Sequence, residues 1–261
     1  MTVPAVRLRD VAIPSEHGGW SLTLEPVLLG LMVAPSGAGV VLGACALVAF
    51  LARTPLKLAA GDRWRKRRLD RTPMAERAAL AYLGLLAFLF GVALLIADAS
   101  FWQPLVMAAP LIAVEIWFDV RSRSRRLLPE LAGTVGIGSV AAAVILAGAG
   151  GWPVALGAWV VVAARSVGTI PFVRLQLRRR KSQPHRIGAS DLAQASSMLL
   201  AVGGALLDWV PWVAVLAVTA LAAVQAWLSR IAVPRTEVIG AQQVVLGLAV
   251  VLVAGLALAS P

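Results

Sequence analysis

Long apolar stretches alternate with short polar connections along the whole 261-residue chain. Most of them approach the 20 residues that a helix needs to cross about 30 Å of hydrocarbon at 1.5 Å per residue. The pattern therefore predicts an all-α fold, a polytopic membrane bundle of about nine transmembrane helices. The apolar stretches cover residues 20–34, 38–59, 75–97, 99–118, 128–149, 152–173, 191–207, 209–232 and 238–259.

The composition supports a membrane location for this pattern. The chain is 59% hydrophobic and 14% charged, whereas soluble domains are about 45–50% apolar and about 25% charged. A water-soluble fold of this length could not cover so much apolar surface. We expect one integral membrane domain over residues 1–261 and, with Cys45 as the single cysteine, no cysteine-based metal site.

The connections between the apolar stretches are of two kinds, which alternate along the chain. The tight turns near 35–38, 97–100, 148–152 and 208 carry Asp98 and Asp208 but no lysine or arginine. Of the 24 Lys and Arg residues, all except Arg165 fall in or beside the connections of the other kind, near 1–19, 53–77, 119–127, 174–190 and 230–237.

This charge asymmetry follows the positive-inside rule. It predicts a multi-pass protein of the plasma membrane with a cytoplasmic N-terminus and the C-terminus outside. The same rule accounts for the net charge of +11. Because no nucleic-acid-binding module is present in the sequence, we expect membrane lipids and no nucleic acid as partners.

Several spacings indicate an internal repeat. Glu16 and Glu130 are 114 residues apart, each beside the start of an apolar stretch, and Arg53 and Arg165 are 112 apart, each followed by a basic cluster. The offsets predict two four-helix halves of the same orientation, with a ninth helix added.

Arg53 and Arg165 are the first candidates for a binding site. Each precedes its loop cluster by about nine residues, or about 13 Å along a helix. A charge at that depth faces the bundle interior, a partner or a wet cavity, unless the side chain snorkels to the interface. We expect Arg53, Lys57, Arg165 and Arg174 to converge on one cavity near the cytosolic leaflet, where guanidinium groups can bind phosphate without a metal.

Acidic residues and one histidine complete the candidate set. The acidic candidates are Glu16, Glu25, Asp62, Glu115, Asp119, Glu130 and Asp191. We place Glu16, Asp62, Asp119 and Glu130 in the binding site, and expect the two arginines within reach of one common anion or of Glu16, Glu115 or Glu130. Simpler roles are open: Asp119 could neutralise Arg121, and Glu130 could stabilise a helix N-terminus. His17 could bind a metal or carry a proton, although a lone histidine more often does neither.

Two family resemblances appear at these residues. The run Pro14-Ser15-Glu16-His17-Gly18-Gly19-Trp20, with Pro26 and Gly30-Leu31 after it, resembles the N-terminal signature of the YwiC-like family of bacterial membrane proteins. The segment from Arg165 to Arg178 also resembles that family. It implies a bacterial plasma membrane protein and no particular activity.

The second resemblance is to the UbiA superfamily of intramembrane prenyltransferases. It covers the nine helices, the long connections after the second and sixth, and the segment from Phe118 to Gly138. Those enzymes hold magnesium and a prenyl diphosphate with two aspartate-rich motifs. Here the first connection offers Asp62 and Asp70 among basic residues, and residues 165–183 contain no acid. We therefore expect the fold and a lipid-phosphate cavity, but no metal site, no cofactor and no catalytic aspartate.

Three functions remain open from the sequence. The first is the binding or handling of a phosphorylated isoprenoid or another anionic lipid at the cytosolic leaflet. The second is transport of a small anion or metabolite past the buried arginines. The third is a non-catalytic role as an assembly partner of a membrane complex. The sequence does not decide whether the protein is an enzyme.

Overall fold

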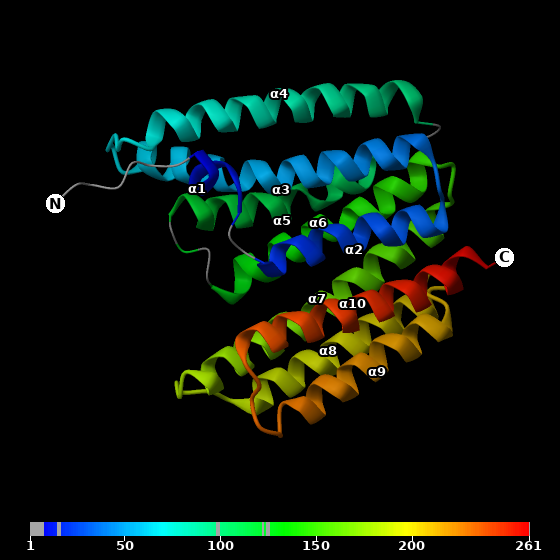
Figure 1. Ribbon diagram of the computed structural model, residues 1–261. Helices are drawn as coiled ribbons and strands as arrows, with labels where there is room; N and C mark the ends of the chain where they lie inside the picture. The colour runs from blue at the N-terminus through cyan, green and yellow to red at the C-terminus, as the bar shows by residue number, and fades with distance from the viewer. Residues whose placement is uncertain (1–7, 15–16, 98–99, 122, 124–125, 261) are drawn as a thin grey trace.

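The computed structural model describes the chain except residues 1–7, 15–16, 98–99, 122, 124–125 and 261. The described residues form helices and no strand (Figure 1). The helices are α1 (Leu8–Ala12), α2 (His17–Val33), α3 (Gly37–Trp64), α4 (Thr72–Ile96), α5 (Trp102–Val120), α6 (Leu127–Ala147), α7 (Trp152–Arg180), α8 (Ile187–Leu206), α9 (Trp212–Leu228) and α10 (Thr236–Ala259).

The long helices α2 to α10 run up and down beside one another, so that the connections gather at two ends (Figure 1). One end, which we call the basic end, carries α1 and the connections after α3, α5, α7 and α9. The opposite end carries the connections after α2, α4, α6 and α8 and the end of α10. The basic connections predicted to share one side of the membrane therefore lie together.

Six of the described helices are long and apolar enough to cross a membrane: α3, α4, α5, α6, α7 and α10. This confirms the predicted all-α helical membrane bundle, and the chain is a multi-pass membrane protein. Helices α2 and α9 are also apolar but shorter. Nine long helices coincide with the nine predicted stretches, whereas membrane crossing by α2, α8 and α9 stays a prediction.

The predicted stretches end too early at the basic end. Helix α3 continues to Trp64 and α7 to Arg180, although the apolar stretches end at 59 and 173. In α7 the extension, residues 174–180, is rich in arginine, which is a good helix former, so this helix persists after the sequence becomes polar. Hydropathy marks the part of a helix that lipid surrounds, whereas backbone hydrogen bonding decides where the helix ends.

Helix α6 lies at the centre of the bundle. Its residues 140–147 are all buried, on every side of the helix, and it packs against α2, α3, α5 and α7. A helix that is buried all round belongs to a core. Three consecutive alanines, Ala141 to Ala143, allow the neighbouring helices to approach closely, as small residues do in membrane bundles.

Helix α4 is the most peripheral of the membrane-spanning helices. Only 11% of its apolar window is buried, and among the described helices it packs against α3 and the short α1. Leu80, Phe88 and Leu95 on its surface are more than 60% exposed. Because the solvent at this surface is hydrocarbon, these side chains are in their preferred environment.

Tryptophans mark both ends of the bundle. Trp102, Trp152 and Trp212 are the first residues of α5, α7 and α9, at the opposite end, and all three are exposed. Trp117 and Trp227 lie in the last turns of α5 and α9, at the basic end, and are exposed too. Exposed tryptophans at both ends of membrane helices form the aromatic belts of the two membrane interfaces.

Helix packing agrees with the predicted repeat in several respects. Helix α3 packs against α4, α5 and α6, and α7 packs likewise against α8, α9 and α10. Two departures occur among the described residues: α8 and α9 pack together whereas α4 and α5 do not, and α2 packs against α6 whereas α6 does not pack against α10. The tryptophans of α5 and α9 keep an offset of 110 residues, close to the 112 between Arg53 and Arg165. These correspondences support the repeat, which stays a prediction.

The orientation can be tested with single cysteines. Cys45 is buried, so a Cys45→Ser protein gives a background without thiols. Arg68 and Gly151 are exposed at the basic and the opposite end. If the positive-inside rule sets the orientation, a membrane-impermeant thiol reagent should label Gly151→Cys in intact cells and Arg68→Cys only in inverted vesicles. The reverse labelling pattern would overturn the predicted orientation.

Candidate functional site

Arg53 of α3 forms the centre of a charged cluster with α5. Its Nη2 lies 2.8 Å from Glu115 Oε1, and its Nε donates to Asp119 Oδ2 at 3.1 Å. Lys57, one turn further along α3, lies 3.7 Å from Asp119 Oδ1. Because Glu115 and Asp119 are four residues apart on α5, their carboxylates share a face and together hold both cations.

Helix α6 extends this cluster towards α7. Gly133 of α6 lies directly against the Glu115 carboxylate, where a Cβ would collide with it. One turn before Gly133, Glu130 Oε2 accepts a hydrogen bond of 2.7 Å from Arg174 Nη1 of α7. Because residues three apart on a helix are neighbours, the Arg53–Glu115 pair beside Gly133 and the Arg174–Glu130 pair lie next to each other at α6. We call the set the basic-end cluster: Arg53, Lys57, Glu115, Asp119, Glu130 and Arg174.

Five of the predicted site residues thus fall in one cluster, namely Arg53, Lys57, Asp119, Glu130 and Arg174. The three cations are partly exposed, at 32%, 30% and 26% of their side chains. Asp119 does not neutralise Arg121, which was the simpler interpretation of the sequence. The Arg121 guanidinium instead stacks on Trp117, 3.7 Å from the ring centroid.

Arg165 lies elsewhere, in a second and deeper site. Its Nη2 donates to Glu25 Oε1 of α2 at 2.7 Å and to the Gln243 carbonyl of α10 at 3.2 Å. Both charged side chains are buried, with 2% and 1% exposure. Helices α3 and α7 are not in contact within the described structure, so Arg165 does not join Arg53 in one cavity.

The Glu25–Arg165 pair, which we call the mid-span pair, lies near the middle of the membrane-spanning region. Gly247 of α10 adjoins both head groups, and a Cβ there would collide with each. Gly247 is eleven residues from the start of α10 and twelve from its end, or about 16 and 18 Å. An ion pair at this depth is costly and is a candidate functional site in a membrane protein.

The mid-span pair is incompletely hydrogen-bonded. Among the described residues, Glu25 Oε2, Arg165 Nε and Arg165 Nη1 have no hydrogen-bond partner, and neither does Gln243 Nε2. A buried ion pair repays its desolvation only when further hydrogen bonds satisfy its remaining donors and acceptors. The pair therefore has unused capacity for binding.

A network of buried polar side chains connects α7 to α10 beside this pair. Gln225 of α9 donates to Gln243 Oε1 at 2.8 Å and to Thr169 Oγ1 at 2.9 Å. Gln194 of α8 donates to Gln225 Oε1 and to the Gly168 carbonyl, both at 3.0 Å. Polar side chains of this kind bind membrane helices to each other.

Asp62 has contacts of its own at the end of α3. It accepts a hydrogen bond of 2.9 Å from Thr72, and Arg67 and Arg71 lie 3.6 and 3.5 Å from its Oδ1. These contacts hold the connection between α3 and α4. Asp62 is nine residues, or about 13 Å, along α3 from Arg53, so it lies apart from the basic-end cluster. Its predicted role in ligand binding stays a prediction.

The remaining predicted residues are Glu16 and His17. Glu16 lies outside the described residues, and His17 is described only as the first residue of α2, without its side chain. Within the described part of the chain, no three His, Cys, Asp or Glu side chains are grouped to hold a metal ion.

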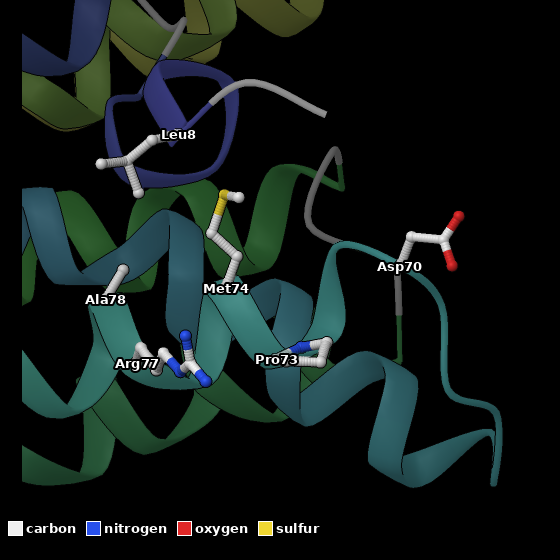
Figure 2. A pocket seen from close by; sticks show the side chains of 6 residues that line it. All are labelled: Leu8, Asp70, Pro73, Met74, Arg77 and Ala78. Carbon is white, nitrogen blue, oxygen red and sulfur yellow. The ribbon is translucent and has the colours of Figure 1, made fainter. Parts of the chain in front are cut away.

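A pocket of about 410 Å³ opens at the basic end between α1 and the start of α4 (Figure 2). Leu8 of α1 faces Met74 and Ala78 of α4 across it, and Asp70 and Arg77 contribute its charged groups. None of the predicted site residues lines this pocket. The pocket and the two charged sites are therefore separate features.

The model of the family described as YwiC-like protein matches residues 13–145, about half of the chain. The chain belongs to the YwiC-like family. No curated protein and no solved structure matches it. In this YwiC-like chain, the matched region contains Glu25 and all residues of the basic-end cluster except Arg174. Arg165 and Arg174 lie beyond the matched region.

Glu25, the partner of Arg165, and Glu115, the partner of Arg53, were among the acidic candidates but not among the predicted binding residues. Glu25 interrupts an apolar stretch before Pro26, and such a position is itself a signal of function. The glutamines of α8, α9 and α10 were missed as well. A single polar residue in an apolar window indicates an interior position, but not which helix it meets.

Removing one charge of the mid-span pair should destabilise the protein strongly. We expect Glu25→Gln or Arg165→Gln alone to lower the free energy of unfolding by about 3–5 kcal/mol, because the remaining charge is buried without a partner. The double variant should recover most of this loss. Thermal unfolding in detergent, followed by tryptophan fluorescence, measures the differences.

The control for these variants is the exposed pair Arg230–Asp191 at the basic end, where Arg230 Nη2 lies 2.9 Å from Asp191 Oδ2. Arg230→Gln should change stability little, because an exposed ion pair is screened by solvent and contributes little. Equal losses for Arg230→Gln and Arg165→Gln would contradict the buried pairing.

The close approach at Gly247 gives a steric test on the same helix. Gly247→Ala should destabilise the bundle by about 1–3 kcal/mol, because the added methyl group displaces a packed ion pair. Gly240→Ala, also on α10, is the matched control, since nothing lies within 4 Å of its Cβ position. Similar unfolding temperatures for the two variants would show that Gly247 does not adjoin the pair.

Proposed function

We propose that this protein binds a phosphorylated isoprenoid or another anionic lipid at the basic-end cluster, in the cytosolic leaflet of the bacterial plasma membrane. The observation that carries the proposal is the cluster itself. Three cations from two different helices lie in partly exposed positions around α6, beside the ends of α5 and α6. A lipid head group lies at this level of a membrane.

The position of these cations on helices distinguishes them from the basic loops. Positive-inside bias needs Lys and Arg in the connections only. Arg53, Lys57 and Arg174 instead belong to α3 and α7, within reach of side chains from α5 and α6. A lipid whose chains lie in hydrocarbon can bring its phosphate to such side chains without leaving the membrane.

Because the cations of the cluster are already paired with acids, a bound phosphate has to exchange with carboxylates. Glu115, Asp119 and Glu130 balance the three cations, so an incoming phosphate replaces carboxylate oxygens on guanidinium groups that are already oriented. Arginine binds phosphate with parallel hydrogen bonds of well-defined geometry. Many further Lys and Arg residues at this end favour an anion as the incoming group.

The proposal includes no magnesium. Hard Mg²⁺ prefers carboxylate and phosphate oxygens in octahedral geometry, and cations beside the acids of this cluster repel a divalent ion. The UbiA-like fold and a transferase activity are not needed for this proposal, which concerns binding. Whether a bond is made or broken in the lipid is a separate question.

Binding of farnesyl phosphate to the purified protein tests the proposal, with farnesol as the uncharged ligand of the same chain. We expect farnesyl phosphate to bind more tightly, with an affinity that falls as salt rises and does not change on chelation of magnesium. Arg53→Gln and Arg174→Gln should each weaken binding by about tenfold or more, the equivalent of one lost charge-assisted hydrogen bond. Calorimetry gives these affinities.

Arg230→Gln serves as the matched control, since Arg230 lies at the same end but pairs with Asp191 outside the cluster. It should retain the affinity of the unmodified protein. Equal binding of farnesol and farnesyl phosphate, or an equal loss in all three arginine variants, would reject the proposal. A strict magnesium requirement would reject the metal-free site.

A further inference from the structure

The mid-span pair has a chemistry that the proposed lipid site does not use. It joins α2 to α7 in the middle of the bundle, away from the basic end. Three N–H-bearing atoms, Arg165 Nε, Arg165 Nη1 and Gln243 Nε2, have no partner among the described residues, against one carboxylate oxygen, Glu25 Oε2. Unused donors therefore outnumber unused acceptors, which favours a negatively charged ligand.

Charge balance decides how such a ligand can enter. The pair is neutral as a whole, and an uncompensated charge at this depth costs several kcal/mol. An anion alone would leave the site with one negative charge, and a proton alone would leave it with one positive charge. An anion and a proton together keep it neutral, with the anion on Arg165 and the proton on Glu25.

We propose that the mid-span pair is a proton-linked binding site for a small monovalent anion. In this step a proton binds to the Glu25 carboxylate, the hydrogen bond between Glu25 Oε1 and Arg165 Nη2 breaks, and the anion takes the place of the carboxylate on the guanidinium. No covalent bond to carbon changes and no electron is transferred. The site is independent of the basic-end cluster and of its lipid.

The surroundings of Glu25 contain one charged group. Among the described residues, Arg165 faces Glu25 from α7, whereas α10 contributes the uncharged Gly247 and Gln243. Helices α3 and α6 pack against α2 through apolar contacts, such as Val27 on Gly43 and Val144 on Gly30. Protonation of Glu25 is therefore coupled to the occupancy of Arg165 rather than to a network of acids.

The polar network of α7 to α10 lies beside this site and extends towards the basic end. The Gln243 side chain accepts from Gln225, which lies one turn before Ser229, and the Ser229 hydroxyl donates to the Gln225 carbonyl at 2.9 Å. The Ser229 carbonyl in turn accepts from Arg179 at 2.7 Å. Hydrogen bonds to the side chains and backbones of Gln243, Gln225 and Ser229 thus link residues from the mid-span pair to the last turns of α7 and α9.

Chloride is the probe for the test, compared with gluconate at equal ionic strength so that screening of the basic end is the same. In Glu25→Gln the carboxylate is replaced by a neutral group, so Arg165 needs another anion. We expect chloride to raise the unfolding temperature of this variant in a saturable manner. The double variant Glu25→Gln/Arg165→Gln should show no difference between chloride and gluconate.

The pH dependence of chloride binding is measured on the unmodified protein. Because one proton enters with each anion, the chloride affinity should fall by about tenfold per pH unit wherever Glu25 is ionised in the anion-free protein. A chloride effect of equal size in the single and double variants, or no effect in either, would overturn the proposal. Failure of farnesyl phosphate to bind would leave these results unaffected, so the two proposals fail separately.

A second measurement applies if Glu25→Gln does not fold. A hydrophobic carbodiimide modifies protonated carboxyl groups in apolar surroundings, and mass spectrometry locates the adduct. In the unmodified protein we expect an adduct on Glu25, formed faster at lower pH and faster in chloride than in gluconate. An absent adduct on Glu25, or a rate that is equal in the two salts, would overturn the proton-linked site.

Discussion

A glutamate and an arginine placed in the middle of an apolar bundle constrain the rest of the structure. Neither charge can be left alone in hydrocarbon, so α2 and α7 must meet where Glu25 and Arg165 bind each other. Gly247 then has to lie at the same level of α10, because any side chain there would collide with the pair. One ion pair thus fixes the relative position of three helices.

A similar arrangement occurs in a shallower form around Arg53. Arg53 and Arg165 are 112 residues apart on α3 and α7, and Gly133 and Gly247, each against the acid of its pair, are 114 residues apart on α6 and α10. The acid differs: Glu115 comes from α5, whereas Glu25 comes from α2. The first site remains partly exposed and suits a lipid head group, while the second is closed and suits a small ion.

Small and polar residues hold the helices together where lipid provides no hydrophobic driving force. The alanines of α6 allow close packing at the centre, and the glutamines of α8, α9 and α10 provide hydrogen bonds between helices. Many leucines lie outside, as on α4, although Phe50, Phe101 and Phe172 are buried. The distribution of residue types is therefore unlike that of a soluble core, in which large apolar side chains fill the interior.

The sequence alone was sufficient for the helical class, the approximate position of each long helix and the placement of the basic connections at one end. Hydropathy and charge report the solvent around each segment, and in a membrane that solvent changes from hydrocarbon to water at every helix end. Depth along a helix follows from residue number, which is why Arg53 and Arg165 were recognised as candidates.

Partners across helices were decided by the tertiary structure only. Arg53 and Arg165 were expected in one cavity, but α6 lies between their helices, so each arginine binds its own acid. Glu25 and Arg165 are 140 residues apart, and nothing in the sequence around either residue identifies the other as its partner. Which faces of two helices meet depends on how ten helices pack at once, because each contact is set by the shapes and charges of all its neighbours.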